Sequence, residues 1–324
     1  MSDLDPLNRS ALARRVEELR AEASNNIEEQ HVLSRVILKQ FTDDRHLLHA
    51  VSVIDRNAMT LKRGPRGVGK VPNFVPQASR SAEELWGRTE NLIPRVIKLC
   101  QQDRLHDDPV AVAVVRDIVA LHYIRNRGLL TIHKRGYEQI RAELRRNARN
   151  MPGYEQGFRR QFRRALRDDE DHDAYFEGLA RKTDSDFRSG LLFRASVERM
   201  FMRCRQWMVE KPVQLLHPEG GMFLIGDSPV ITVDHLGRLG PENGVAIGDA
   251  IQILMPLTPR TLIAFGPSAT GVVPAEIVAE LNTFQVCAAH EYVFVHPASG
   301  LEDFVRTVRF GADVVGGELS SESL

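Results

Sequence analysis

The sequence predicts an α+β fold, in which a mainly helical N-terminal two thirds packs on a small mixed β-sheet formed largely by the C-terminal third. Before residue 215 most segments repeat apolar residues at helical spacing, and after it short β-branched runs alternate with Gly, Pro and Asp. A doubly wound sheet would need strands alternating regularly with helices, and the first two thirds lack them. We expect one large domain over residues 1–324. Its expected parts are an N-terminal helix and linker (1–27), a mainly helical part (28–215), a sheet-containing part (216–310) and a flexible tail (311–324).

Helical spacing defines most of the expected N-terminal elements. Helices are expected over 6–23 and 32–41, and later at about 81–100, 109–125, 134–149, 155–167 and 189–210. Between the second and third helices, apolar residues flank Asp-Arg-Asn at 55–57, which predicts a small β-hairpin over 51–61. The stretch 64–77 carries three glycines and three prolines, so we expect it to be loop.

Short strands dominate the expected C-terminal elements. Strands are expected at 222–225 and 230–233, on either side of Gly-Asp-Ser-Pro, and at 251–255 and 261–265, on either side of Pro-Leu-Thr-Pro. A helix is expected over 274–289, because a proline suits its first turn and Glu276 lies near the positive end of its dipole. A last strand is expected at 292–295.

The composition favours a folded protein with no single dominant charge. Hydrophobic residues make up 43% of the 324 residues and charged residues 27%, which allows a sizeable core. Lys plus Arg equals Asp plus Glu, at 43 each, so the overall charge predicts no polyanionic partner and leaves only local basic patches to consider.

The cysteines and the apolar runs bear on the compartment. Three widely spaced cysteines fit neither a zinc ribbon nor a disulfide framework. The first twenty residues lack the apolar core of a secretory signal, and no run approaches the ~18 apolar residues of a membrane span. We therefore expect a reduced, cytoplasmic protein with no membrane partner.

The segment Gly64–Lys70 (GPRGVGK) matches the spacing of a phosphate-binding loop, G-x-x-x-x-G-K. Such a loop needs a helix directly after it, whose N-terminus meets the phosphates, and a Ser or Thr that binds magnesium. Here Val71 and Pro72 follow, with no hydroxyl and no helix start. We interpret the segment as a flexible loop without nucleotide binding.

A basic stretch at 134–167 holds eleven Lys and Arg against three Glu, with aromatic residues interleaved. Cations that meet phosphates and aromatics that stack on bases are typical of nucleic-acid-binding surfaces. The candidate nucleic-acid-binding residues are Arg145, Arg146, Arg149, Arg159, Arg160, Arg163 and Arg164. Six acidic residues follow within 168–177, so the alternative is that they fold back and neutralise the arginines on a solvated face.

His31 and Asp227 lie at the ends of expected elements, where functional side chains are often found. His31 lies directly before an expected helix, where a side chain can reach a ligand bound by free backbone N–H groups. Asp227 ends an expected strand. Its carboxylate would form a local Asx turn or be presented at the sheet edge as a catalytic acid or metal ligand, and the sequence leaves both open.

Several motifs follow one another in a fixed order. The opening segment His31–Phe41 reads HVLSRVILKQF. The later motifs are Asp55, Trp86 and Glu90, His122–Arg125, Gln206–Trp207, Asp227–Pro229, Met255–Pro259 and Asn282. Together they resemble the bacterial family of uncharacterised proteins catalogued as domain of unknown function 4238, whose opening motif is roughly H-x-P-Q-x-x-L-x-x-F. The resemblance covers about residues 28–296 and implies a fold and a set of polar positions. It is compatible with a nucleic-acid substrate and implies no established reaction.

The first functional hypothesis is a phosphodiester hydrolase of nuclease type. His31 would be the general base or a metal ligand, and Glu90 and Asp227 would be carboxylates for a divalent ion. Arg125 would stabilise negative charge in the transition state, and Asn282 would orient the substrate. The hypothesis requires these distant residues to meet around one pocket.

The second hypothesis is a non-catalytic module that binds nucleic acid or a protein through the Arg-rich helices at 134–167. The polar residues would then form a buried network that ties helices to the sheet. A third reading, a structural subunit with an oligomer interface along 189–210, is weaker because the same apolar stripe is more simply core. The sequence does not determine an oligomeric state.

Overall fold

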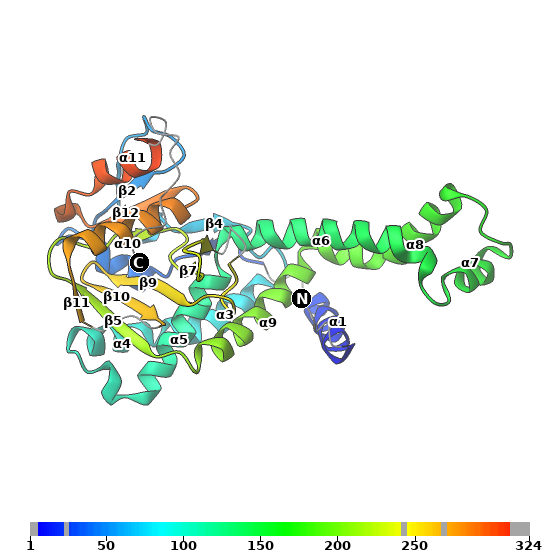
Figure 1. Cartoon of the computed structure of the whole chain (residues 1–324), viewed down its shortest axis with the longest axis horizontal. Helices are drawn as coiled ribbons and strands as arrows, with labels where there is room; N and C mark the ends of the chain where they lie inside the picture. The colour runs from blue at the N-terminus through cyan, green and yellow to red at the C-terminus, as the bar shows by residue number, and fades with distance from the viewer. Residues whose placement is uncertain (1–5, 23–25, 241–244, 267–270, 312–324) are drawn as a thin grey trace. The chain divides into compact units, whose positions relative to one another are not determined.

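The computed structural model describes residues 6–22, 26–240, 245–266 and 271–311. Helices fill most of the N-terminal two thirds, and most of the strands lie in the C-terminal third, which confirms the α+β class (Figure 1). The chain forms two compact units. Unit 1 comprises residues 1–27, 75–82 and 130–198, and unit 2 comprises residues 28–74, 83–129 and 199–324.

The two units differ from the parts that the sequence predicts. Unit 2 takes in segments from both sides of residue 215, where the sequence suggests a boundary, because helices from the first half of the chain and strands from the second share its contacts. The expected flexible tail, 311–324, lies outside the described residues apart from Gly311.

Unit 1 is helical. It contains α1 (Pro6–Ala21), most of α6 (Arg127–Asn147), η4 (Ala148–Asn150), α7 (Tyr154–Phe162), α8 (Asp169–Ser189) and the first part of α9 (Leu191–Met208). α6 and α8 run antiparallel, since Arg141 pairs with Glu177 and Arg145 with Asp173. Aromatic residues of α7 and α8 form a small core at the far end of this pair.

Helix α8 is missing from the elements that the sequence predicts. Its acidic beginning looks like a solvated charge run, but it forms the first turn of a helix, where negative charge meets the positive end of the dipole. The Asp168 carboxylate caps this turn by accepting from the Asp171 amide at 2.9 Å. The helix ends at Gly190, whose φ of 86° is left-handed. The helix expected over 155–167 stops at Phe162, before α8 begins at Asp169.

Unit 2 contains the other helices. They are α2 (Arg35–Leu38), most of α3 (Ser79–Glu90), α4 (Ile93–Gln101), α5 (Pro109–Ile124), α10 (Ala275–Ala288) and α11 (Glu302–Phe310), with η1 (Lys39–Phe41), η2 (Pro65–Gly67), η3 (Leu105–Asp107) and η5 (Pro297–Ser299). The single helix expected over 81–100 is two helices. The sequence also missed α11.

Three sheets complete the described part of unit 2. The pair β1 (Glu29–His31) and β4 (Lys70–Pro72) is antiparallel. A six-stranded mixed sheet has the order β11 (Gly271–Val273), β5 (Val213–Pro218), β10 (Thr261–Phe265), β9 (Gln252–Thr258), β7 (Ile231–Val233) and β8 (Leu239–Gly240). A four-stranded sheet has the order β3 (Leu61–Arg63), β2 (Leu48–Ser52), β12 (Tyr292–Val295) and β6 (Ile225–Gly226).

The sheets correct three expectations. The stretch 64–77 is not all loop, because β4 pairs with β1. The strands on either side of Gly-Asp-Ser-Pro belong to different sheets, β6 to the smaller and β7 to the larger. The expected hairpin is present as β2 and β3, with a longer connection than the sequence indicates.

Helix α10 packs between the two larger sheets. Val278 and Leu281 contact the core of the six-stranded sheet. Val286 and Ala289, at its C-terminal end, contact the core of the four-stranded sheet. No helix in the described ranges combines the length and the apolar character that a membrane span requires.

The end of α8 gives the first prediction. A Cβ on Gly190 would lie 2.2 Å from Cγ of the rigid Pro76 ring, and the left-handed backbone also disfavours other residues. Gly190→Ala should lower the free energy of unfolding by about 1–3 kcal/mol. The matched control is Gly178→Ala in the exposed interior of α8, where a Cβ meets nothing within 4 Å. Gly178→Ala should raise the free energy of unfolding by about 0.5–1 kcal/mol, because alanine is favoured over glycine inside a helix. Urea unfolding measures both, and equal effects would contradict the role of Gly190.

Candidate functional site

His31 ends β1 and leads into a tightly held turn. The amides of Val32 and Leu33 both donate to the Gly69 carbonyl, at 3.0 and 3.4 Å. Ser34 comes next, fully buried before α2. Its amide donates to Nε2 of His122 at 3.2 Å, and its hydroxyl donates to Oε1 of Glu90 at 2.6 Å. The start of α2 is thereby fixed to α5 and α3.

Helix α3 presents Glu83, Trp86 and Glu90 on one face, because residues three and seven apart share a helix side. The guanidinium of Arg125, at the end of α5, meets this face and is 1% exposed. Its Nη1 donates to Oε1 of Glu90 at 2.6 Å, and its Nη2 lies 4.0 Å from Oε2 of Glu83. Its Cζ lies 4.3 Å from the ring centroid of Trp86, a cation–π contact.

Five buried polar atoms in this cluster have no hydrogen-bond partner among the described residues. They are Nδ1 of His31, Nε of Arg35, Oε1 of Glu83, and Nε and Nη2 of Arg125. Each such atom costs about 1–3 kcal/mol when it stays unbonded. Four unbonded nitrogens and one carboxylate oxygen make a site that a ligand with oxygen acceptors can complete.

The protonation states follow from burial and from neighbouring charges. Burial, with Lys70 and Arg35 adding to it, lowers the pKa of His31 to about 4, so its imidazole is neutral at pH 7. Burial raises the pKa of the Glu83 carboxyl. Burial has the same tendency at Glu90, but Arg125 and Ser34 outweigh it and hold the pKa of Glu90 below its usual value. The two glutamates of one helix face therefore shift in opposite directions.

His122 is fixed on both sides of its ring. Nδ1 lies 2.8 Å from the Ile118 carbonyl and acts as donor, since Nε2 accepts from the Ser34 amide. Burial lowers the pKa of His122 to about 4. This histidine positions Ser34 and has no ring nitrogen left for a ligand.

The Asp227 carboxylate bonds to backbone amides just before and at the start of β12. It accepts from the amides of His290, Glu291 and Tyr292 at 2.8, 2.8 and 3.2 Å, and Asp227 is 5% exposed. Burial raises the pKa of Asp227, and these three amides oppose the rise. The expected Asx turn cannot form, because residue 229 is proline and has no N–H.

Asn282 also serves the backbone. Its Oδ1 accepts from the Leu224 amide at 3.0 Å, and its Nδ2 donates to the Met222 carbonyl at 2.9 Å. One turn later, Gln285 makes the same kind of clamp with Gly226 and Pro229. The segment around β6 is thus tied to α10, and both polar groups of Asn282 are used.

Of the five predicted catalytic residues, Glu90 and Arg125 are in direct contact. His31 makes no hydrogen bond to either within the described ranges, and its relation to them is that both charges act on the pKa of its imidazole. No hydrogen bond or ion pair among the described residues joins Asp227 or Asn282 to these three. The described part of the chain also holds no group of three or more His, Cys, Asp or Glu that could bind a metal ion. The two carboxylates predicted to hold a divalent ion each have other partners: Arg125 and Ser34 bond to Glu90, and three backbone amides bond to Asp227.

The predicted catalytic set does not include four other members of the cluster, which are Ser34, Arg35, Glu83 and His122. Of these, only Glu83 lies outside the motifs that the sequence offers. The helical spacing of Glu83, Trp86 and Glu90 is a signal that could have revealed one of them.

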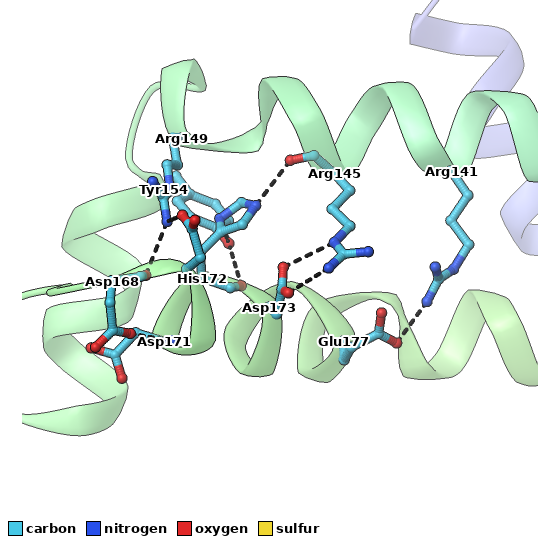
Figure 2. Close-up of polar contacts among 10 residues, drawn as sticks. Arg141, Arg145, Arg149, Tyr154, Asp168, Asp171, His172, Asp173 and Glu177 are labelled. Atoms are coloured by element: carbon cyan, nitrogen blue, oxygen red, sulfur yellow. Dashed lines mark hydrogen bonds and ion pairs between the residues drawn. The ribbon is translucent and has the colours of Figure 1, made fainter.

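The Arg-rich stretch faces acidic side chains of α8 (Figure 2). Nε of Arg145 donates to Asp173 at 2.9 Å, Arg149 pairs with Asp169 at 2.6 Å, and Arg164 pairs with Asp171. Arg159 lies 3.9 Å from Glu155. The remaining candidates have no ion pair within the described ranges: Arg146, Arg160 and Arg163. This arrangement is the neutralisation that the sequence left open as an alternative.

The fold and the cluster define an α+β protein with a buried cluster of Arg, Glu and His side chains, several of whose polar atoms have no hydrogen-bond partner among the described residues. Residues 29–299 match the family described as Protein of unknown function (DUF4238), so the chain belongs to that family. No curated protein and no solved structure matches it.

The low histidine pKa values predict a loss of stability in mild acid. An unfolded histidine binds its proton near pH 6.5, whereas folded His31 and His122 do so near pH 4. The folded state binds fewer protons between these values, so stability falls as the pH drops through this window. Between pH 7.0 and 4.5, His122→Gln should reduce that fall by about 2–3 kcal/mol in urea unfolding. Exposed His106→Gln should leave it unchanged. An unaltered fall in His122→Gln would refute the assignment.

Proposed function

We propose that the protein is a phosphodiester hydrolase acting on nucleic acid, with its chemistry at the His31–Glu90–Arg125 cluster. The observation that carries the proposal is the buried guanidinium of Arg125. Two of its nitrogens are unbonded, beside a neutral histidine whose Nδ1 is also unbonded. Guanidinium groups bind phosphate oxygens with paired, charge-assisted hydrogen bonds, and a buried site strengthens such bonds.

Each side chain has a role that its environment supports. Nδ1 of His31 would accept the proton of an attacking water, since the imidazole is neutral at pH 7. Arg125 and Arg35 would bind the phosphate oxygens as negative charge develops on them. Glu83, whose raised pKa favours its protonated form, would give a proton to the leaving oxygen. Glu90 would hold Arg125 and Ser34 in place.

The alternative function, a binding module built on 134–167, has weaker support. Three of its seven candidate arginines have acidic partners on α8, and a nucleic acid would have to displace them. We also propose a cytoplasmic location, because Cys100, Cys204 and Cys287 are all free thiols.

Hydrolysis assays test the proposal. The purified protein should cleave bis(p-nitrophenyl) phosphate and single-stranded RNA or DNA. His31→Asn and Arg125→Lys should each lower the rate by about 10²-fold or more. The matched control, His106→Asn, changes an exposed histidine of the same unit and should keep the full rate.

Circular dichroism establishes that the variants are folded. If folded His31→Asn cleaves as fast as the unaltered protein, His31 is not the base and the mechanism fails. If the unaltered protein cleaves none of these substrates, the hydrolase itself must be abandoned.

A further inference from the structure

A cavity of about 170 Å³ lies in unit 2 and includes none of the catalytic cluster. Its apolar floor is on the four-stranded sheet, where Ala50 is paired with Leu61 on one side and with Phe294 on the other. All three residues line the cavity. Because the middle residue is only an alanine, a hollow remains between two large apolar side chains.

Charged side chains line the same cavity above this floor. The cations are Arg63, Lys70 and Arg127, and the carboxylates are Asp227 and Glu291. Asp227 already accepts three backbone amides, and Glu291 pairs with Arg127 at 2.6 Å. Lys70 pairs with Glu29 at 2.6 Å. Arg63 is exposed and has no ion pair among the described residues, so it is the cation left to meet an anion.

The glycine-rich motif that fails as a phosphate-binding loop forms another wall. Its residues Gly67 to Lys70 line the cavity. Gly69 has a φ of 68°, and a Cβ there would lie 3.0 Å from Cδ1 of Leu38, so glycine is needed. The Gly69 carbonyl holds the turn that follows His31. The motif therefore connects this cavity to the strand that carries the proposed base.

We propose that this cavity binds the nucleobase of a nucleotide, whose phosphate is held by Arg63. An engineered cavity of about 150 Å³ holds a benzene ring, so this cavity has the size for one planar ring, as in a pyrimidine. The apolar floor suits the face of such a ring, and the Glu291 carboxylate at the rim can accept from its N–H groups.

The inference rests on the proposed function in one respect: the bound nucleotide would be the neighbour of the cleaved phosphate. The chain supports this relation at two points. Val32, in the cavity wall, directly follows His31, and Arg127, at the rim, comes two residues after Arg125. The substrate would then be an unpaired strand, since a paired base cannot enter a cavity.

Calorimetry of the full chain with cytidine 5′-monophosphate tests the proposal. The nucleotide should bind at least tenfold more tightly than ribose 5-phosphate, which lacks the base. Arg63→Ala should weaken its binding about tenfold. The matched control is Lys62→Ala, on the same strand β3 and equally exposed, whose side chain alternates to the other face and does not line the cavity. It should bind as the unaltered chain does.

A second variant tests the floor. Ala50→Leu fills the hollow and should bring nucleotide binding down to the level of ribose 5-phosphate, with its folding followed by circular dichroism. Equal binding of the two ligands by the unaltered chain, or an Arg63→Ala effect no larger than that of Lys62→Ala, overturns the proposal even if Ala50→Leu does not fold.

His31→Asn separates this inference from the hydrolase. The variant should lose hydrolysis and keep nucleotide binding. Nucleotide binding by a protein that cleaves nothing supports the cavity and refutes the hydrolase. Cleavage without nucleotide binding supports the hydrolase and refutes the cavity.

Discussion

One carboxylate oxygen, Oε1 of Glu90, joins three parts of unit 2. It accepts from Nη1 of Arg125 at the end of α5 and from the hydroxyl of Ser34 at the start of α2, while Glu90 itself ends α3. Removing Arg125 from water is costly, and a buried ion pair often contributes little net stability. Its effect is to fix geometry, because any shift of one helix end breaks a hydrogen bond to Glu90. The turn after His31 depends on this point, and so does every atom of the candidate site.

The buried polar residues of unit 2 form two groups: one bonds to backbone groups, and the other keeps polar atoms without a partner among the described residues. Asp227, Asn282 and Gln285 give their polar atoms to the backbone around β6, whose short ladder leaves amides and carbonyls that need partners. In the cluster around Arg125, by contrast, polar atoms stay unbonded inside the protein. The difference between the two groups is whether hydrogen-bonding capacity is left over. Residue type does not reveal it, because a carboxylate or an amide serves either purpose.

The spacing of apolar residues predicted helices and strands correctly where one side of the element packs against a core. Helices α5 and α10 and strand β12 lie close to where apolar spacing predicts them, because burial of a stripe or a face requires that spacing. Apolar spacing did not predict α8, because the charged residues of this helix pair with arginines of α6 that lie far from them in the sequence. It failed likewise for β4, a three-residue strand in a glycine-rich stretch that exists only because β1 lies beside it.

The sequence alone determined the α+β class and most helices and nominated His31, Glu90 and Arg125 as candidates, since these follow from spacing and from motifs that occur in order. Only the tertiary structure decided that Asp227 and Asn282 bond to backbone groups, that Glu83 and Ser34 join the cluster, and that a glycine-rich stretch forms one wall of a cavity. The physical reason is the range of the interactions involved. Hydrophobic periodicity depends only on residues within one helix or strand, so the sequence shows it. The partner of a buried polar atom comes from whichever distant segment packs beside it, so only the tertiary structure shows that partner.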